Sequence, residues 1–290
     1  KYIYAVSLSL GLVTSIVTFG YAYILASTTP DFEQNLYRGF SEMRESIKGK
    51  YPFFTTNIYS LESALRYNKV EYALGQILDE TNQVLSDLQD WIQLDEFEKI
   101  VLMLYNDDLA RAVLILIESS TFALDYEGAM CAVALETICS VLDNTKQGTF
   151  LENDRWKNCV VPKFEILIKQ LLDSEIISKE HAATMRKKLN GLNMPTNGDK
   201  LSVPFENRGY TLSKSEKEVI QKRNRFLHGH IIGHTYDEAY KEILYSCMEL
   251  QKLCAILLFR EAGFKGYIIN NAVLMGLEQA VNDKEPILVK

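Results

Sequence analysis

Apolar residues recur at three- and four-residue spacing along this 290-residue chain from residue 60 onward, and helices account for this spacing best. Helices that each carry an apolar face must pack those faces against one another to remove them from water. The predicted fold class is therefore mostly α, an up-and-down helical bundle. The helical stretches are expected over residues 61–92, 95–105, 109–122, 126–143, 160–173 and 178–190.

A charge-free stretch runs from Tyr2 to Pro30 and is long enough to cross a bilayer. Serine, threonine and tyrosine side chains dilute it, however, and a short helix near Ile3–Val13 followed by a strand over Ser15–Ile24 fits its composition better. We therefore expect a short remnant of a mixed α/β N-terminal domain whose beginning is missing, since the chain starts at Lys1 rather than Met. A membrane anchor stays as the alternative.

The segments divide the chain into three expected parts. Residues 1–55 form the end of the mixed α/β N-terminal region and a connector, in which one helix is predicted near Phe32–Ile47. Residues 56–122 are a helical region that packs on the bundle, and residues 123–290 are the helical bundle domain itself.

Local signals place the last helices more closely. A loop dense in Gly, Asn and Pro spans residues 190–198. Ser213 and Glu216 have the spacing of a capping box, which predicts a helix that starts at Ser213 and ends near His228. A long amphipathic helix follows over about Tyr236–Glu261, and short helical pieces are expected after it.

Charge and cysteine usage limit the classes of function. The net charge of −7 excludes a surface that is basic all over, so any contact with nucleic acid needs a local basic patch. The five cysteines are an odd number, without a CxxC pair or zinc-ligand spacing, which indicates reduced, buried thiols in a cytoplasmic protein.

Three of the four histidines, His228, His230 and His234, lie within seven residues. This density first suggests a metal site. Around Gly229 and Gly233, however, the stretch has no acidic or cysteine partner at helical spacing, which fits the geometry of a three-ligand zinc site poorly. We therefore expect no metal and no cofactor.

The run from Arg223 to His228, with Asn224 second, resembles the ribonuclease motif of the HEPN family: an Arg, a polar residue, three variable residues and a His. In that family the motif lies near the C-terminal end of a helix within a helical bundle, as expected here. The resemblance covers about 150 residues and is closest to ApeA-like HEPN proteins of bacterial anti-phage defence, where a mixed domain precedes the HEPN domain. It implies a HEPN-like bundle over residues 123–290.

Metal-independent RNA cleavage needs a base for the 2′-OH, an acid for the leaving oxygen and a cation near the phosphate. His228 titrates near neutral pH and suits the base or acid, Arg223 is always charged and suits the phosphate, and Asn224 suits an orienting role. On an ideal helix Asn224 and His228 share a face, whereas Arg223 lies about 100° round from Asn224. The resemblance implies a homodimer in which two motifs meet at a shared cleft.

Two further groups surround the motif. Glu136 stands in an apolar stretch and must face solvent or pair with a cation; Arg223 is a plausible partner, either in a structural ion pair or in the site. Lys222, Arg225 and His230 are the candidate RNA-binding side chains, because the helix is basic within an acidic chain. The plainer interpretation is a solvated basic helix face with His228 at its end.

The resemblance thus implies a HEPN-type endoribonuclease of a defence or toxin system, which cuts tRNA or other single-stranded or loop RNA through a 2′,3′-cyclic phosphate. It would act in the cytoplasm as a homodimer, without a membrane, and under a regulatory partner or an N-terminal sensing domain. The alternative is a non-catalytic HEPN module for dimerisation or for nucleotide or partner binding. A membrane-anchored helical protein is the third hypothesis.

Overall fold

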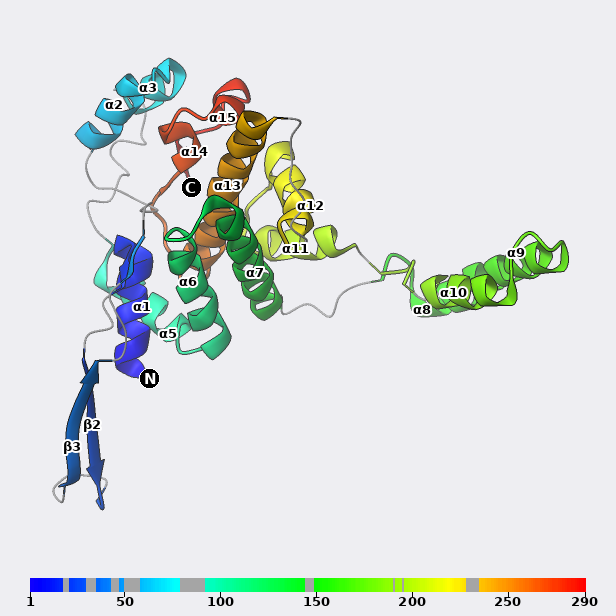
Figure 1. The fold of residues 1–290 in the computed structure, drawn as a ribbon, viewed down its shortest axis with the longest axis horizontal. Helices are drawn as coiled ribbons and strands as arrows, with labels where there is room; N and C mark the ends of the chain where they lie inside the picture. The colour runs from blue at the N-terminus through cyan, green and yellow to red at the C-terminus, as the bar shows by residue number, and fades with distance from the viewer. Residues whose placement is uncertain are drawn as a thin grey trace.

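The computed structural model describes residues 1–17, 21–29, 35–42, 47–49, 58–78, 92–143, 149–189, 191–194, 196–227 and 235–290. Over these ranges the chain is mostly helical, which confirms the predicted fold class. Figure 1 shows a helical bundle from which a strand hairpin projects on one side and a pair of helices on another.

The N-terminal segment is a helix followed by strands, as predicted. Helix α1 (Tyr2–Thr14) buries Leu8 and Leu12 and packs on the helical region that follows. Strand β1 (Ile16–Val17) pairs antiparallel with β4 (Ile47–Lys48). Among the helices that the structure describes, none has the length and apolar character needed to cross a membrane.

The helix predicted near Phe32–Ile47 is wrong. Strand β3 (Asn35–Glu42) occupies most of that range and pairs antiparallel with β2 (Tyr21–Ser27), as Figure 1 shows. Gly39 lies inside the segment and lowers its helix propensity. The preceding β-prone strand also offers a complete set of backbone partners, so tertiary pairing decides the conformation.

The helical region after residue 57 begins with two helices rather than one continuous run. Helices α2 (Ile58–Tyr67) and α3 (Glu71–Leu78) are separated by a turn in which Lys69 adopts a left-handed φ of 57°. Residues 79–91 lie outside the described part of the chain. Helices α5 (Leu94–Met103) and α6 (Asp107–Ser119) then follow close to their predicted positions.

Two long helices form the centre of the bundle. Helix α7 (Leu124–Leu142) packs against α6, against α12 (Lys214–Leu227) and against α13 (Tyr236–Glu261). The bounds of α13 are those predicted from the sequence. Its middle is buried on all sides, with Leu253, Ala255 and Leu257 inaccessible to solvent. This burial follows from the contacts of α13 with α5, α7, α12, α14 (Asn271–Leu274) and β5 (Ile268–Ile269).

The segment between α7 and α12 leaves the bundle and returns. Its helices are α8 (Asn153–Arg155), the π-helical η1 (Trp156–Val160), α9 (Val161–Asp173) and α10 (Lys179–Leu189). Figure 1 shows α9 and α10 side by side, well away from the bundle. We call residues 149–189 and 191–194 the arm.

Helix α11 (Asn197–Asn207) was not predicted, and its first two residues fall in the predicted 190–198 loop. It begins with a capping box in which Thr196 and Asp199 satisfy each other's backbone amides. Because Asn, Gly and Pro dominate the preceding residues, this start signal is easily read as more loop.

The C-terminal segment folds back onto the start of the helical region. The side-chain amide of Asn68 donates to the backbone oxygen of Leu274 at 2.7 Å, and the Tyr72 hydroxyl donates to the backbone oxygen of Glu285 at 3.0 Å. The elements of this segment are β5 (Ile268–Ile269), α14 (Asn271–Leu274), α15 (Glu278–Asn282) and β6 (Leu288–Val289).

Four of the five cysteines are buried and free, as predicted: Cys131, Cys139, Cys247 and Cys254. Burial raises the pKa of the Cys131 and Cys139 thiols to about 12, so both stay protonated at neutral pH. Cys159 departs from the prediction, because it lies exposed on η1 in the arm.

Candidate functional site

Helix α12 positions the motif residues, and its start is fixed by the predicted capping box. The backbone nitrogen of Ser213 donates to the Glu216 carboxylate at 2.8 Å, and the backbone nitrogen of Glu216 donates to the Ser213 hydroxyl at 3.2 Å. From that start the helix packs one face on α7 and α13, burying Val219, Ile220 and Phe226. Arg223, Asn224 and Arg225 are therefore carried by a helix that is fixed at its start and packed along one face.

Arg223 and Glu136 meet between α12 and α7. The Nε of Arg223 donates to Oε1 of Glu136 at 2.9 Å, and its Nη1 donates to the backbone oxygen of Ile220 at 2.7 Å. The Arg223 side chain is only 4% exposed, whereas the Glu136 side chain is 40% exposed. The partner expected for Glu136 from the sequence is thus the one it has.

This arrangement changes what Arg223 can do chemically. A phosphate would have to compete with Glu136 for a guanidinium that is already buried and paired, and breaking such a pair is costly. Arg223 is better placed to hold the carboxylate of Glu136 in one orientation, with part of that carboxylate open to solvent. The group that faces outward here is Glu136.

The other motif residues of α12 divide between solvent and ion pairing. Asn224 and Arg225 are exposed. Lys222 is partly buried, and its ammonium group donates to Glu242 of α13 at 3.0 Å. The predicted basic patch is therefore narrower than the sequence indicated, with Arg225 its most accessible cation among these residues.

A hollow of about 760 Å³ adjoins Lys222 and lies between α13 and α15. Its charged lining consists of two lysines and four carboxylates. Such a lining repels a polyanion on balance. The charged residues are Lys222, Lys241, Glu238, Glu242, Glu278 and Asp283.

His228, His230 and His234 lie outside the described residues, so their arrangement around the motif stays a prediction. Within the ranges that the structure describes, no three His, Cys, Asp or Glu side chains are grouped as metal ligands.

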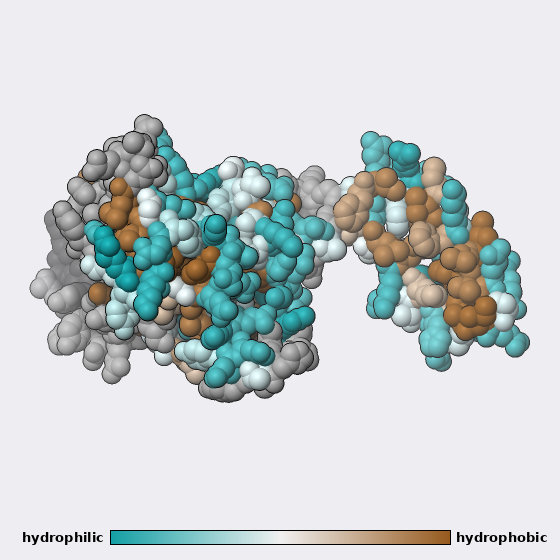
Figure 2. All heavy atoms as spheres, turned by 90° about the horizontal axis from the view of Figure 1, so that it is seen from above, coloured by the Kyte–Doolittle hydropathy of each residue, from teal (hydrophilic) through white to brown (hydrophobic). Residues whose placement is uncertain are grey.

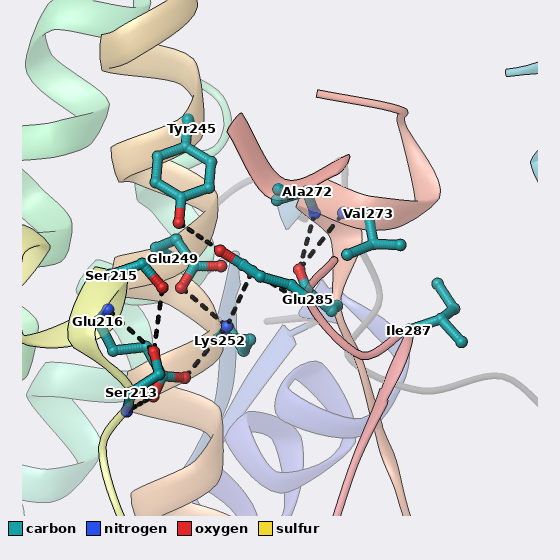
Figure 3. Close-up of polar contacts among 12 residues, drawn as sticks. Ser213, Ser215, Glu216, Tyr245, Glu249, Lys252, Ala272, Val273, Glu285 and Ile287 are labelled. Atoms are coloured by element: carbon teal, nitrogen blue, oxygen red, sulfur yellow. Dashed lines mark hydrogen bonds and ion pairs between the residues drawn. The ribbon is translucent and has the colours of Figure 1, made fainter. Parts of the chain in front are cut away.

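A second polar cluster, the Lys252 cluster, surrounds the other end of α12. Figure 3 shows Lys252 of α13 facing three carboxylates from three segments. Its ammonium group lies 2.8 Å from Glu249, 3.1 Å from Glu216 and 3.7 Å from Glu285. All four side chains are at most 8% exposed.

Hydroxyl and amide donors contact two of these carboxylates, Glu216 and Glu285. The Tyr210 hydroxyl donates to Glu216 at 2.7 Å, and the Tyr245 hydroxyl donates to Glu285 at 2.5 Å. The Asn270 amide donates to the second oxygen of Glu285 at 2.9 Å. The cluster therefore ties α12, α13 and the C-terminal segment together through groups that water no longer reaches.

Burial and the charges of the neighbouring groups shift the pKa values of Glu249, Lys252 and Glu285. Burial raises the pKa of Glu249 to about 8, although Lys252 opposes the shift, so Glu249 is mostly protonated at neutral pH. Burial alone would lower the pKa of Lys252, but the three carboxylates outweigh it and raise that pKa above its ordinary value. Burial alone would raise the pKa of Glu285, but the charge of Lys252 and the hydrogen bonds that Tyr245 and Asn270 donate to Glu285 lower it.

The proton distribution argues for anchoring rather than catalysis at Lys252. A lysine held firmly protonated lacks the lone pair that a nucleophile or base needs. A cavity of about 630 Å³ opens beside the cluster, and its lining mixes Lys214 and Lys284 with acidic residues, without a dominant sign of charge. In the described part of the chain, Arg223 and Glu136 thus form a polar pair that is partly open to solvent, whereas the Lys252 cluster is closed to it.

Sequence reasoning missed the Lys252 cluster. The available signal was a Glu and a Lys three residues apart inside the apolar run of α13, where charged side chains are rarely buried unless paired. The partners Glu216 and Glu285 come from 36 and 33 residues away in the chain, and spacing does not connect them.

Comparison with protein-family models, with curated proteins and with solved structures finds no match for this chain.

Proposed function

We propose that this chain is a metal-independent endoribonuclease of HEPN type that cuts tRNA or other single-stranded or loop RNA through a 2′,3′-cyclic phosphate. The observation that carries the proposal is the pairing of Arg223 with Glu136 at 2.9 Å. It brings a partly exposed carboxylate from α7 to the turn of α12 that carries Arg223.

Each motif residue has a proposed role, and for Arg223, Asn224 and Arg225 that role is consistent with the surroundings that the structure describes. His228 exchanges a proton with the 2′-OH or the leaving oxygen, because its pKa range suits both. Arg223 acts as a positioning residue through Glu136. Asn224 and Arg225 contact the RNA, and the guanidinium of Arg225 is the fork that suits a phosphate. The chemistry needs no metal and no cofactor.

The site is completed by a second copy of the chain. One motif presents its groups around a helix, whereas two motifs related by a two-fold axis present them to one cleft. We place the protein in a bacterial defence or toxin setting in the cytoplasm, under a regulatory partner or sensing domain, because a free ribonuclease would harm its own cell.

The test is incubation of the purified protein with a tRNA and phage RNA pool in EDTA, beside His228→Ala. The matched control is His181→Ala, which removes the one histidine outside the motif region, exposed on α10. We expect cyclic-phosphate ends from the wild type and from His181→Ala, and intact RNA with His228→Ala. Equal cleavage by all three proteins contradicts the assignment of His228.

A second candidate function is a non-catalytic HEPN module for dimerisation or for nucleotide or partner binding. The burial of Arg223 favours it, since a 4% exposed side chain already paired with Glu136 also serves as a structural link between α12 and α7. Intact RNA in every lane, from a wild-type protein that is dimeric, selects this candidate over the nuclease.

A further inference from the structure

The two ends of the arm are joined to each other by hydrogen bonds of Asn193. Asn193 is 3% exposed, and its side chain exchanges two hydrogen bonds of 2.9 Å with the backbone of Leu151. Its backbone oxygen accepts a third from the backbone nitrogen of Phe150 at 3.0 Å. These three hydrogen bonds hold residues 150–151 and Asn193 side by side at the base of the arm. Helices α9 and α10 project from this base together, as Figure 1 shows.

The arm is poorly covered by its own packing. In α9 and α10 together, only Ile168, Ala182 and Leu189 are buried. Large apolar side chains lie in water instead, and Figure 2 shows them gathered in brown over much of the arm. The exposed ones on the two helices and at the tip are Phe164, Ile166, Leu167, Ile176 and Met185.

The amount of exposed apolar surface calls for a partner. At about 200 Å² for each large side chain, the exposed fractions of these five residues amount to roughly 500 Å². This is at the upper end of the largest apolar patch on a typical monomer, and it approaches the roughly 800 Å² that each partner of a stable complex buries. The arm therefore has the surface of one half of an interface.

Charge along the arm indicates which partner fits. The tip, between α9 and α10, carries Asp173, Glu175 and Glu180, with Lys179 the one cation among them. The end of α10 at the base carries Arg186, Lys187 and Lys188 in its last turn. A surface that is acidic at one end and basic at the other is complementary to itself when a second copy lies antiparallel.

We propose that the arm pairs antiparallel with the arm of a second copy of this chain, forming a four-helix bundle. Each acidic tip then lies against the basic base of the other arm, about 20 Å away along a 13-residue helix. The exposed apolar residues fill the core between them. This pairing goes beyond the proposed function, because it uses no residue of the motif and adds a second contact between copies to the shared cleft.

The first test is sedimentation of the full chain over a range of concentrations, beside Ile166→Glu/Ile176→Glu. These residues are 59% and 69% exposed, so the double substitution does not disturb the fold of one copy. The matched control is Gln170→Glu/Ser174→Glu, which adds the same charge at exposed polar positions of the same region. We expect dimers of the wild type and the control, and at least tenfold weaker association of the apolar variant.

Charge reversal tests the antiparallel arrangement. Lys187→Glu/Lys188→Glu places like charges against the acidic tip and is expected to weaken the dimer several-fold. Adding Glu175→Lys/Glu180→Lys to the same chain restores opposite signs and is expected to restore the dimer. Failure of this rescue overturns the antiparallel pairing.

Spin labels on the exposed Cys159 give an independent measurement, since the other four cysteines are buried. A single narrow distance between the labels of two copies, lost in the Ile166→Glu/Ile176→Glu variant, is the expected result. The proposal is overturned if the wild type stays monomeric, if it binds RNA through the arm as a monomer, or if the apolar variant dimerises as well as the wild type. A monomeric wild type would also remove the shared cleft of the proposed nuclease. An apolar variant that dimerises as well as the wild type, or a failed charge rescue, contradicts the arm pairing alone.

Discussion

The two ends of α12 hold polar groups in opposite ways. Near its start, Glu216 joins the Lys252 cluster, whose charged side chains are at most 8% exposed and contact one another directly. Two turns later, Arg223 is as deeply buried, but its partner Glu136 is 40% exposed. One helix thus carries a closed ion cluster and an ion pair that opens to solvent.

The difference teaches how buried charge relates to function in this chain. A closed cluster gives up the hydration of all its members, so its contribution is to hold segments in one arrangement. An ion pair with one exposed member keeps a carboxylate that is oriented and still reachable. We therefore expect substitutions at the closed cluster to act on stability, and substitutions at the open pair to act on activity.

Replacement of Lys252 by Met is expected to have the largest effect. It leaves the buried carboxylates without their cation, which costs about 3–5 kcal/mol of unfolding free energy. Chemical denaturation measures this loss. Lys241→Met is the control, since Lys241 pairs with Glu278 at 3.5 Å with both side chains mostly exposed, and such pairs contribute about 0–1 kcal/mol. Equal losses of unfolding free energy for the two substitutions would show that the buried Lys252 contributes no more to stability than the exposed Lys241.

Gly128→Ala tests how tightly α7 holds the motif end of α12. A methyl group at Gly128 would lie 2.8 Å from the Phe226 ring, so the ring must shift, at a cost of about 1–3 kcal/mol. Thermal unfolding and RNA cleavage are measured together. Gly75→Ala is the matched control, because nothing lies within 4 Å of its new methyl group and alanine favours the helix. An unchanged melting temperature for Gly128→Ala would show that the ring is not constrained there.

Glu249→Gln tests the proton distribution in the closed cluster. The folded pKa of Glu249, about 8, lies above the ordinary value of 4.5, so the folded state binds the extra proton between these values. The stability that Glu249 contributes is therefore complete below pH 4.5 and is lost as the pH rises to 8. We expect Glu249→Gln to flatten the fall of the melting temperature between pH 5 and pH 8 by roughly half or more. A slope identical to that of the wild type would show that Glu249 is ionised throughout.

Glu136→Gln is expected to have the smallest effect on stability, about 1 kcal/mol or less, because Glu136 is partly exposed and Gln keeps an oxygen for Arg223. Its effect on cleavage is expected to be at least tenfold. Glu165→Gln is the control: Glu165 is also 40% exposed and pairs with Arg186 at 2.8 Å, but that arginine is itself 44% exposed. Unchanged cleavage by Glu136→Gln would reduce the open pair to a structural link.

The parts of the fold that local patterns determine were predictable. The capping box at Ser213 and the periodicity of Tyr236–Glu261 placed α12 and α13 closely, because local hydrogen bonds and one apolar face decide both. Strand β3 was not predictable in this way, since its partner β2 decides its conformation. Helix α11 begins with a local signal at Thr196, but its Asn- and Gly-rich surroundings concealed that signal.

The candidate site divides along the same line. The Arg223 and Glu136 pair followed from one carboxylate in an apolar stretch and one helix that was rich in cations. The Lys252 cluster did not follow, because Glu216 and Glu285 reach Lys252 only through the packing of three segments. That Arg223 would be buried and Glu136 exposed also depends on packing, so the sequence assigned the phosphate contact to Arg223.

The return of the C-terminal segment to α2 and α3 bears on how the protein is made. Asn68 bonds to Leu274 and Tyr72 to Glu285, over 206 and 213 residues of chain. A ribosome that adds about 5–20 residues per second reaches Glu285 roughly 10–40 s after Tyr72. During that interval α2 and α3 lack the contacts that the C-terminal residues supply, so part of their apolar surface stays exposed on the nascent chain. We expect chaperones to bind there in this period.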